Sequence, residues 1–320
     1  TASLFMIEAS MHIPPGYAMF IPAAIRKAVD LPVVGVGRFK DPLQAERALA
    51  EGQCDLVGIV RGQIADADFA IKARAGATDE IRLCLSCNQE CVGRMGLNRW
   101  LGCIENPRTG RENEWRVNNH LAITAKPKKV MVAGAGPAGL QAAIAAARKG
   151  HQVTVYEKEP VAGGQVRIAA SVPNRAEFGD MIRNQLAECN RLGVSFVYGS
   201  GVWPGLVEET KPDHVIVATG AEPSRPRWVA DASTDETANR VCDVRAILDG
   251  SALMGGPQSG DSVVVIDEIG FHHATSTAEV LADRGCNVEI VTPGMVVGQD
   301  LGITLDMENW WMRAGAKGIV

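Results

Sequence analysis

Residues 130–140 read VMVAGAGPAGL, in which three glycines follow the pattern G-x-G-x-x-G. An apolar run rich in valine precedes the first glycine, and an alanine-rich stretch follows the last one. A strand, a tight turn and the start of a helix, in this order, form the phosphate-binding turn of dinucleotide-binding domains. The stretch therefore predicts an α/β fold with a parallel sheet, built around a Rossmann-like domain.

Each glycine of this fingerprint has its own expected role. Gly134 makes the tight turn, Gly136 lets the backbone approach a pyrophosphate, and Gly139 permits close packing of the helix. Pro137 and Ala138 open that helix, whose first N–H groups carry partial positive charge toward a phosphate. A glycine turn without a ligand is the alternative reading, and a lone G-x-G-x-x-G would not exclude it.

Further elements downstream favour a bound dinucleotide. Glu157 ends the next apolar run about twenty positions on, where an acidic residue holds ribose hydroxyls. Gly164 and Gln165 follow it, and Thr219 and Gly220 end a distal Ala-Thr-Gly element. These elements resemble those of flavoproteins with two dinucleotide-binding domains, so we expect FAD rather than NAD. A bound ADP moiety remains the alternative.

A third strand–turn–helix run departs from the pattern. Residues 263–272 read VVVIDEIGFH, so Asp267 and Glu268 stand where the glycines of a phosphate turn belong. Their side chains would crowd a pyrophosphate, and two carboxylates would repel it. We expect this second lobe to keep the fold as a scaffold and not to bind NAD(P)H in the usual way.

Four cysteines fall within twenty residues, in the pattern Cys84-x2-Cys87-x3-Cys91-x11-Cys103. Thiolates are soft ligands that suit iron–sulfur clusters and zinc. Structural zinc sites usually show two similar C-x2-C pairs, whereas here three cysteines are bunched and the fourth is alone. We therefore predict a [4Fe–4S] cluster, with zinc and unligated thiols as the alternatives.

Positive charge near this segment would balance a cluster that bears four thiolates. The nearby basic residues are Arg94, Arg99, Arg108 and Arg111. The remaining cysteines lie apart in apolar or helical surroundings, and we predict that each is a buried structural thiol. They are Cys54, Cys189, Cys242 and Cys286.

Composition excludes several functional classes. The chain has 320 residues and a net charge of -5, and such a surface argues against a dedicated binder of nucleic acid or of membranes. We find no apolar stretch long enough to span a bilayer and no leader segment, so we expect a cytoplasmic protein.

The chain starts without Met and ends as a strand begins, so it reads as part of a longer polypeptide or as a subunit completed by another chain.

Residues 1–82 alternate apolar runs with helical patterns, which predicts a parallel sheet covered on both faces. The expected strands span residues 4–7, 31–36 and 55–60. The expected helices span residues 20–28, 42–51 and 65–75.

The chain as a whole resembles the multidomain NADH:flavin oxidoreductase/Old Yellow Enzyme family, which includes trimethylamine dehydrogenase, 2,4-dienoyl-CoA reductase and the dimethylglycine and N-methylproline demethylases. The matching motifs are Gly37-Arg38-Phe39, Val60-Arg61-Gly62 with Asp66-Ala67-Asp68, CLSCNQEC over residues 84–91, Cys103 with Asn106-Pro107-Arg108, and the Gly134 fingerprint.

This resemblance implies four domains: residues 1–82 are the C-terminal part of an FMN-binding TIM barrel, 83–118 an iron–sulfur segment, 127–225 an FAD- or ADP-binding Rossmann-like domain, and 226–320 an incomplete, degenerate second lobe. The phosphate site of such barrels forms after strands 7 and 8. Gly37, Arg38, Arg61 and Gly62 are therefore the candidates for the FMN phosphate; arginines that merely close the rim are the alternative.

Three functional hypotheses follow from the resemblance. The favoured one is oxidative demethylation or dehydrogenation of a small N-methylated amine, with electrons passed from FMN through the cluster to a protein acceptor such as an electron-transfer flavoprotein. The second is an NADPH-dependent enoyl reductase of the 2,4-dienoyl-CoA reductase type. The third is a non-catalytic electron-transfer subunit. No catalytic acid or base is assigned, because the substrate-contacting residues of the family lie mostly on earlier strands. A homo-oligomer is a further open alternative.

Overall fold

The computed structural model describes residues 4–117, 122–224, 241–252 and 256–320. The chain divides into two compact units: the first comprises residues 1–166 and 177–219, and the second comprises residues 167–176 and 220–320. The domain boundary expected after residue 82 falls within the first unit and stays a prediction, and the boundary expected after residue 118 lies outside the described residues. The boundary expected at residue 225 lies outside the described residues.

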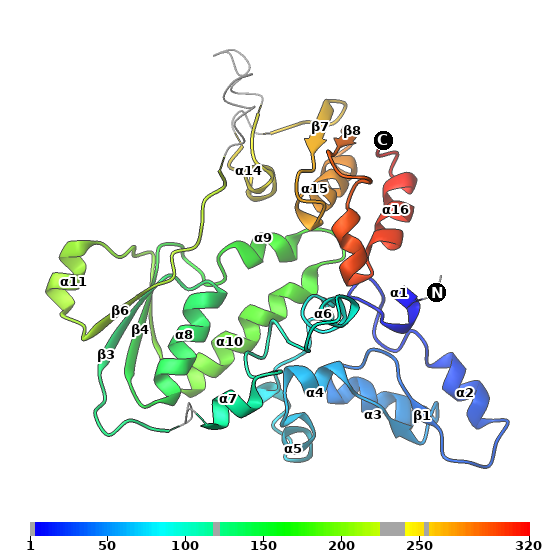
Figure 1. Ribbon diagram of the computed structural model, residues 1–320, viewed down its shortest axis with the longest axis horizontal. Coiled ribbons are helices and arrows are strands. Elements are labelled where there is room, and N and C mark those ends of the chain that lie inside the picture. Colours follow the sequence, from blue (N-terminus) through cyan, green and yellow to red (C-terminus); the bar gives the residue numbers. More distant parts are fainter. Residues whose placement is uncertain (1–3, 118–121, 225–240, 253–255) are drawn as a thin grey trace. The chain divides into compact units, whose positions relative to one another are not determined.

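A four-stranded parallel sheet carries the fingerprint in the first unit (Figure 1). Its strand order is β5-β4-β3-β6, with β3 (Lys129–Ala133), β4 (Gln152–Glu157), β5 (Ser195–Tyr198) and β6 (His214–Val217). Helix α8 (Pro137–Arg148) packs on this sheet, and α10 (Gly179–Arg191) packs on α8. The predicted α/β fold with a parallel sheet is confirmed.

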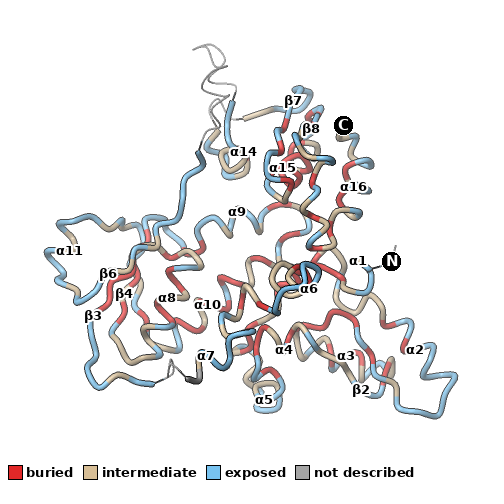
Figure 2. Tube along the Cα trace, viewed as in Figure 1, coloured by how far each residue is buried: buried red, intermediate tan, exposed pale blue. Residues whose placement is uncertain are grey.

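The core of this part follows from its sequence. The strands β3 and β4 are rich in valine because a parallel sheet buries both faces. Val132 pairs with Val155 across the two strands, and neither side chain is exposed. Leu140 and Ile144, four residues apart on α8, cover them from one helix face. Figure 2 shows buried residues gathered along β3, β4, α8 and α10.

The N-terminal residues form only a small sheet. Strands β1 (Val34–Gly35) and β2 (Leu56–Val57) pair in parallel but have two residues each. The helices of this region are α1 (Leu4–Ile7), α2 (Phe20–Arg26), α3 (Pro42–Ala50), α4 (Arg61–Ala65) and α5 (Phe69–Arg74), with a 3-10 turn at Thr78–Glu80. A closed barrel is not seen among the described residues.

Two predictions for this region were wrong. Residues 4–7 form helix α1 and not a strand, because an apolar run of four residues has no period that distinguishes the two. The helix expected over residues 65–75 is interrupted between α4 and α5. The buried Asp66 breaks it, since its carboxylate accepts hydrogen bonds from the backbone N–H groups of Asp68 and Arg82.

The cysteine segment is poor in regular structure, as predicted. Its helices are α6 (Val92–Gly96) and α7 (Glu112–Val117). Of the four scattered cysteines, Cys54, Cys189 and Cys286 are buried. Cys242 is exposed, so its predicted burial was wrong.

The second unit contains the third strand–turn–helix run. Strands β7 (Ser262–Ile266) and β8 (Asn287–Val291) pair in parallel, and α15 (His272–Asp283) connects them. Its core includes Leu281, Leu301 and Trp310. The other elements described in the two units are α9 (Gln165–Ser171), a 3-10 turn at Ala176–Phe178, α11 (Pro204–Thr210), α14 (Val244–Asp249), a 3-10 helix at Gln299–Thr304, and α16 (Met307–Ala316).

The end of the chain extends this second sheet. The backbone N–H of Val320 donates to Val288 at 3.1 Å, and its carbonyl accepts from Ile290 at 2.8 Å. These bonds to β8 agree with the expectation that the last residues begin a strand. Among the helices described, none has both the length and the apolar character needed to cross a membrane.

Candidate functional site

The four clustered cysteines line one cavity in the first unit. Cys84, Cys87, Cys91 and Cys103 share its wall with apolar side chains that include Leu85 and Ile104. The loop reaches this shape through left-handed backbone at Ser86 (φ 52°) and at Asn88 (φ 56°). The Ser86 N–H points at the Cys84 sulfur, 3.3 Å away. A tight loop thus turns the first three sulfurs toward a common space.

Burial governs the chemistry of these thiols. It raises the pKa of Cys87 and Cys91, and it raises the pKa of Cys103 to about 12. For Cys91, the nearby Arg61 guanidinium lowers the pKa against this effect. Metal ligation requires the thiolate form, so loading this site would release protons.

The donor set fits an iron–sulfur cluster. Four thiols line one cavity whose wall combines apolar and polar side chains, and a [4Fe–4S] cluster takes one thiolate for each of four irons, which lie apart. A single zinc ion would draw its sulfurs to about 2.3 Å from one point. Within the ranges that the structure describes, no group of three or more His, Cys, Asp or Glu side chains is arranged to hold a metal ion. The assignment of the cluster itself stays a prediction.

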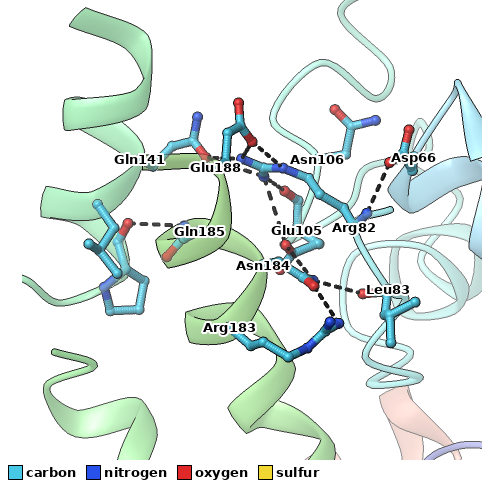
Figure 3. A network of polar contacts seen from close by, with 12 residues as sticks. Asp66, Arg82, Leu83, Glu105, Asn106, Gln141, Arg183, Asn184, Gln185 and Glu188 are labelled. Carbon is cyan, nitrogen blue, oxygen red and sulfur yellow. Dashed lines mark hydrogen bonds and ion pairs between the residues drawn. The ribbon is translucent and has the colours of Figure 1, made fainter. Parts of the chain in front are cut away.

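A buried arginine clamps both ends of this segment (Figure 3). Arg82 precedes the first cysteine, and its Nη1 donates to the carbonyl of Glu105, which follows the last cysteine, at 2.7 Å. The same guanidinium binds Glu188 of α10 through Nε at 2.9 Å and Nη2 at 2.6 Å. Its side chain also reaches Gln141 of α8. Arg82 therefore fastens the cysteine segment to the dinucleotide-binding part of the unit.

Glu105 takes part in the same network. Its Oε1 accepts from the Asn184 amide at 2.9 Å, and Asn184 also donates to the carbonyl of Leu83. Burial raises the pKa of Glu105 to about 7, although the charge of Arg82 opposes the change. Sequence reasoning missed Arg82, Glu105 and Glu188, because partners up to 106 residues apart leave no local signal.

The arginines expected to balance the cluster do not line the cavity. Arg94 donates to Glu90 at 2.8 Å and stacks over Trp100, and Arg99 is exposed. Arg61 lines the cavity instead. We chose those arginines because they are near the cysteines in sequence. Arg61 precedes the first cysteine by 23 residues, and only the fold brings it to the cavity.

The fingerprint glycines have the three predicted environments. Gly134 has φ +103°, and a Cβ there would lie 2.3 Å from the carbonyl oxygen of Ala218. A Cβ on Gly139 would lie 1.9 Å from the carbonyl oxygen of Gly134. A Cβ on Gly136 would meet nothing within 4 Å. The open side of the turn is therefore at Gly136, where a pyrophosphate would approach, with Pro137 and Ala138 as the first residues of α8.

Other predicted residues gather around this turn. The Gly163 N–H donates to Ala135 at 2.9 Å, which brings Gly164 beside Gly136, and Gln165 begins α9 directly after it. Thr219 lies against Gly134 and leads into Gly220, whose φ is +82°. The carboxylate of the buried Glu157 accepts from the Ala135 N–H at 2.7 Å and from the Glu159 N–H at 3.0 Å. It thus braces the turn at the place expected for ribose recognition.

The residues proposed for the FMN phosphate meet different partners. Gly37 and Arg38 follow β1, and Arg61 and Gly62 follow β2, as expected. The Arg38 guanidinium forms a bidentate pair with Glu177, with contacts of 3.0 Å and 2.9 Å. Its Nε–H is buried without a partner in the described part of the chain, so one donor remains for a phosphate oxygen. Nothing in the sequence signalled Glu177, which is 139 residues away.

In the second unit, the turn that replaces the third fingerprint is already filled. The Asp267 side chain is 1% exposed. One carboxylate oxygen accepts from the Gly270 N–H at 2.8 Å, and the other from the Gly298 N–H at 3.1 Å. An aspartate thus takes backbone donors at the turn where a dinucleotide phosphate would sit.

The nearby His272 and His273 do not act together. His272 lies between Arg175 and Asp306, with its Nε2 2.7 Å from Arg175 Nη1 and 3.4 Å from Asp306 Oδ2. The backbone carbonyl of His273 accepts from Thr277. His272 therefore belongs to a buried polar group that holds the start of α15 in place.

Comparison with known proteins identifies two family segments. Residues 128–294 match the model of the pyridine nucleotide-disulphide oxidoreductases. Residues 9–80 match the model of the NADH:flavin oxidoreductase / NADH oxidase family.

Individual relatives match most of this chain. An NADH oxidase of Thermoanaerobacter brockii is 39% identical over 86% of this chain and 41% of its own length. An N,N-dimethylglycine/sarcosine dehydrogenase of Chromohalobacter salexigens is 35% identical over 90% of this chain and 42% of its own length. The solved structure of 6-hydroxypseudooxynicotine amine oxidase from Pseudomonas geniculata has a TM-score of 0.87 at 29% identity, over 98% of this chain and 47% of that one. The chain spans less than half the length of these relatives.

Proposed function

The chain belongs to the multidomain flavin oxidoreductases of the NADH:flavin oxidoreductase/Old Yellow Enzyme family, and from this premise we propose that it is the cluster- and dinucleotide-binding part of an oxidative demethylase. The substrate would be a small N-methylated amine, and a protein such as an electron-transfer flavoprotein would be the acceptor. The relative named for dimethylglycine and sarcosine supports this substrate class.

The observation that carries the proposal is the filled turn at Asp267. A lobe that admits NAD(P)H needs free backbone N–H groups and a close approach to the pyrophosphate. Here the Asp267 carboxylate takes the Gly270 and Gly298 N–H groups, and its charge would repel a second anion. The lobe is therefore a scaffold, and the reducing equivalents come from an organic substrate.

Three cofactors have residues to hold them. Gly37, Arg38 and Gly62 would surround the FMN phosphate at the end of a barrel of which residues 1–82 are the last part. Cys84, Cys87, Cys91 and Cys103 would ligate the cluster, and the Gly136 turn with Glu157 would hold FAD or ADP. When bound, these groups would supply two-electron chemistry at the flavin and single-electron transfer at the cluster.

The proposal gives the residues of this chain specific tasks. The Arg38–Glu177 pair would orient the remaining Nε donor toward the phosphate. The Arg82 clamp would hold the ends of the cysteine segment together, so that Cys84 and Cys103 face one cavity. The apolar side chains in that wall, which include Leu85 and Ile104, would keep water from the metal centre.

Anaerobic mixing of the full-length protein with N,N-dimethylglycine, and separately with NADPH, tests the proposal. We expect the flavin absorbance to bleach rapidly with the amine and not with NADPH. Rapid bleaching by NADPH, with none by methylated amines, would refute it. Iron, acid-labile sulfide and flavin are measured on the same preparation, so that a protein without cofactors is not mistaken for an inactive one.

An NADPH-dependent enoyl reductase is the second candidate. The open turn at Gly136 favours it, because a complete dinucleotide site is present in the first unit. The relative named NADH oxidase points the same way. The NADPH arm of the same experiment decides between the two functions.

A non-catalytic electron-transfer subunit, completed by a separate barrel chain, is the third candidate. A cluster protein that contains no FMN and co-purifies with a second chain would support it. FMN bound to the same polypeptide as the cluster would exclude it.

A further inference from the structure

The cysteine-lined cavity has an unbalanced positive charge. Its two acidic wall residues each have an arginine partner: Arg94 lies 2.8 Å from Glu90, and Arg82 lies 3.8 Å from Glu105. Arg61 is the one basic residue among the described residues of the wall. In the ranges that the structure describes, it forms no ion pair with a carboxylate. Its charge therefore remains to act on whatever fills the cavity.

The fold holds this guanidinium in place. Arg61 is the first residue of α4, directly after the loop that follows β2. Its Nη1 donates to Oδ1 of Asn88 at 2.5 Å. Asn88 is fully buried inside the cysteine loop, and its amide donates to the carbonyl of Glu8 at 2.7 Å. Since that bond fixes the amide, the Asn88 oxygen faces Arg61, and the arginine is tied to the segment between Cys87 and Cys91.

A cation at this position acts differently on the two oxidation states of a cluster. A [4Fe–4S] cluster with four thiolates is an anion, and one-electron reduction adds one more negative charge. The attraction to a fixed cation grows with that charge, and it is strong in a cavity that excludes water. A nearby uncompensated arginine therefore stabilises the reduced form more than the oxidised form.

We propose that Arg61 is a positioning residue that raises the reduction potential of the cluster held by Cys84, Cys87, Cys91 and Cys103. The proposal rests on the proposed function, because it presupposes that cluster. The sequence predicts that Arg61, which follows β2, binds the FMN phosphate. Its contact with Asn88 makes it a charged link from the loop after β2 to the cluster segment.

Redox titration of the full-length protein, followed by the electron paramagnetic resonance signal of the reduced cluster, tests this role. For Arg61→Gln we expect the ratio of reduced to oxidised cluster at a fixed potential to fall by about tenfold or more, which corresponds to about 59 mV for a one-electron couple. For Arg61→Lys, which keeps the charge, we expect a change below about threefold. Arg99→Gln is the matched control, since it removes an exposed arginine of the cysteine segment.

Flavin content is measured on each sample, and the wild-type titration is repeated after removal of FMN, so that lost flavin is not taken for an effect of Arg61. A shift below about threefold in Arg61→Gln, or one equal to that of Arg99→Gln, would overturn the proposal. If Arg61→Gln retains no iron, the Arg61→Lys variant decides. An Arg61→Lys protein that keeps its iron and a reduction potential near that of the wild type supports the role. Loss of iron from Arg61→Lys, or a tenfold change in its ratio of reduced to oxidised cluster, contradicts the role. Absence of iron from the wild type would instead refute the proposed function.

Discussion

Gly136 and Gly139 belong to one fingerprint, yet the structure gives them different physical tasks. A Cβ on Gly139 would strike the carbonyl oxygen of Gly134 at 1.9 Å, whereas one on Gly136 would meet nothing within 4 Å. Gly136 also has φ −74°, which alanine adopts without strain. One glycine therefore serves the packing of α8, and the other leaves room for a ligand.

Alanine substitutions separate these tasks. We expect Gly139→Ala to lower the free energy of unfolding by about 1–3 kcal/mol through overpacking. Gly136→Ala should leave it unchanged or raise it by up to about 1 kcal/mol, and should weaken binding of FAD or ADP. Urea unfolding and isothermal titration with ADP measure the two effects. Equal loss of stability in both variants would contradict the assignment.

Asp267 is the second residue with a defined local task. Its carboxylate satisfies two backbone N–H groups that would otherwise be buried without acceptors. We expect Asp267→Asn to lower the free energy of unfolding by about 1–3 kcal/mol, because the new amide group must turn one donor against an N–H. Glu268→Gln, at an exposed neighbour, should change it by less than about 0.5 kcal/mol. Thermal unfolding of both variants provides the comparison, and similar values would show that the filled turn contributes little.

At the scale of elements, helix α10 connects the cysteine segment to the dinucleotide-binding sheet. Asn184 and Glu188 lie four residues apart, on one helix face, and they bind Glu105 and Arg82 respectively. Arg148 of α8 adds a second cation 2.5 Å from Glu188. The helix therefore carries a buried polar face toward the cysteine segment.

Removal of one member of this buried group should be costly. We expect Arg82→Met to lower the free energy of unfolding by about 3–5 kcal/mol, because Glu105 would stay buried without a cation and Glu188 would keep only Arg148. Arg183→Met, on α10, should cost only about 0–1 kcal/mol, because the Arg183 side chain is 47% exposed and its contacts with Asp180 and Asn184 are only partly buried. Denaturant unfolding with a fluorescence readout distinguishes them. A small effect of Arg82→Met would mean that water enters the network when the arginine is removed.

On the scale of the whole molecule, the two parallel sheets described in the first unit differ in size and in how far they are buried. β3 and β4 are mostly buried, while Val34 of β1 is 55% exposed and Leu56 of β2 is 55% exposed. A parallel sheet normally buries both faces, so a two-stranded one is not self-sufficient. The barrel strands proposed to precede it would supply the missing cover.

Hydrogen exchange of this chain alone checks that difference. We expect amides of β3 and β4 to exchange at least about tenfold more slowly than those of β1 and β2, since local opening is easier where few apolar contacts are made. In the full-length protein, protection of β1 and β2 should rise toward that of β3. Equal protection in the two sheets of the isolated chain would show that the small sheet is stable without further strands.

The sequence by itself determined the features that depend on neighbours in the chain. The glycine fingerprint, the valine-rich strands and the cysteine spacing all concern residues within about one strand–turn–helix unit, whose geometry is set by local backbone sterics. The short apolar run at residues 4–7 is where such local reasoning failed, because four residues do not distinguish a helix from a strand.

Only the tertiary structure decided which charges meet. Arg38 finds Glu177 across 139 residues, Arg82 finds Glu188 across 106, and Arg61 reaches the cysteine cavity instead of the arginines next to it in sequence. A buried charge requires a partner or a ligand, but sequence carries no record of which distant group will supply it. The partner is chosen by how strands and helices pack, which is why the cysteine spacing predicts the cofactor and the fold alone reveals the arginine that tunes it.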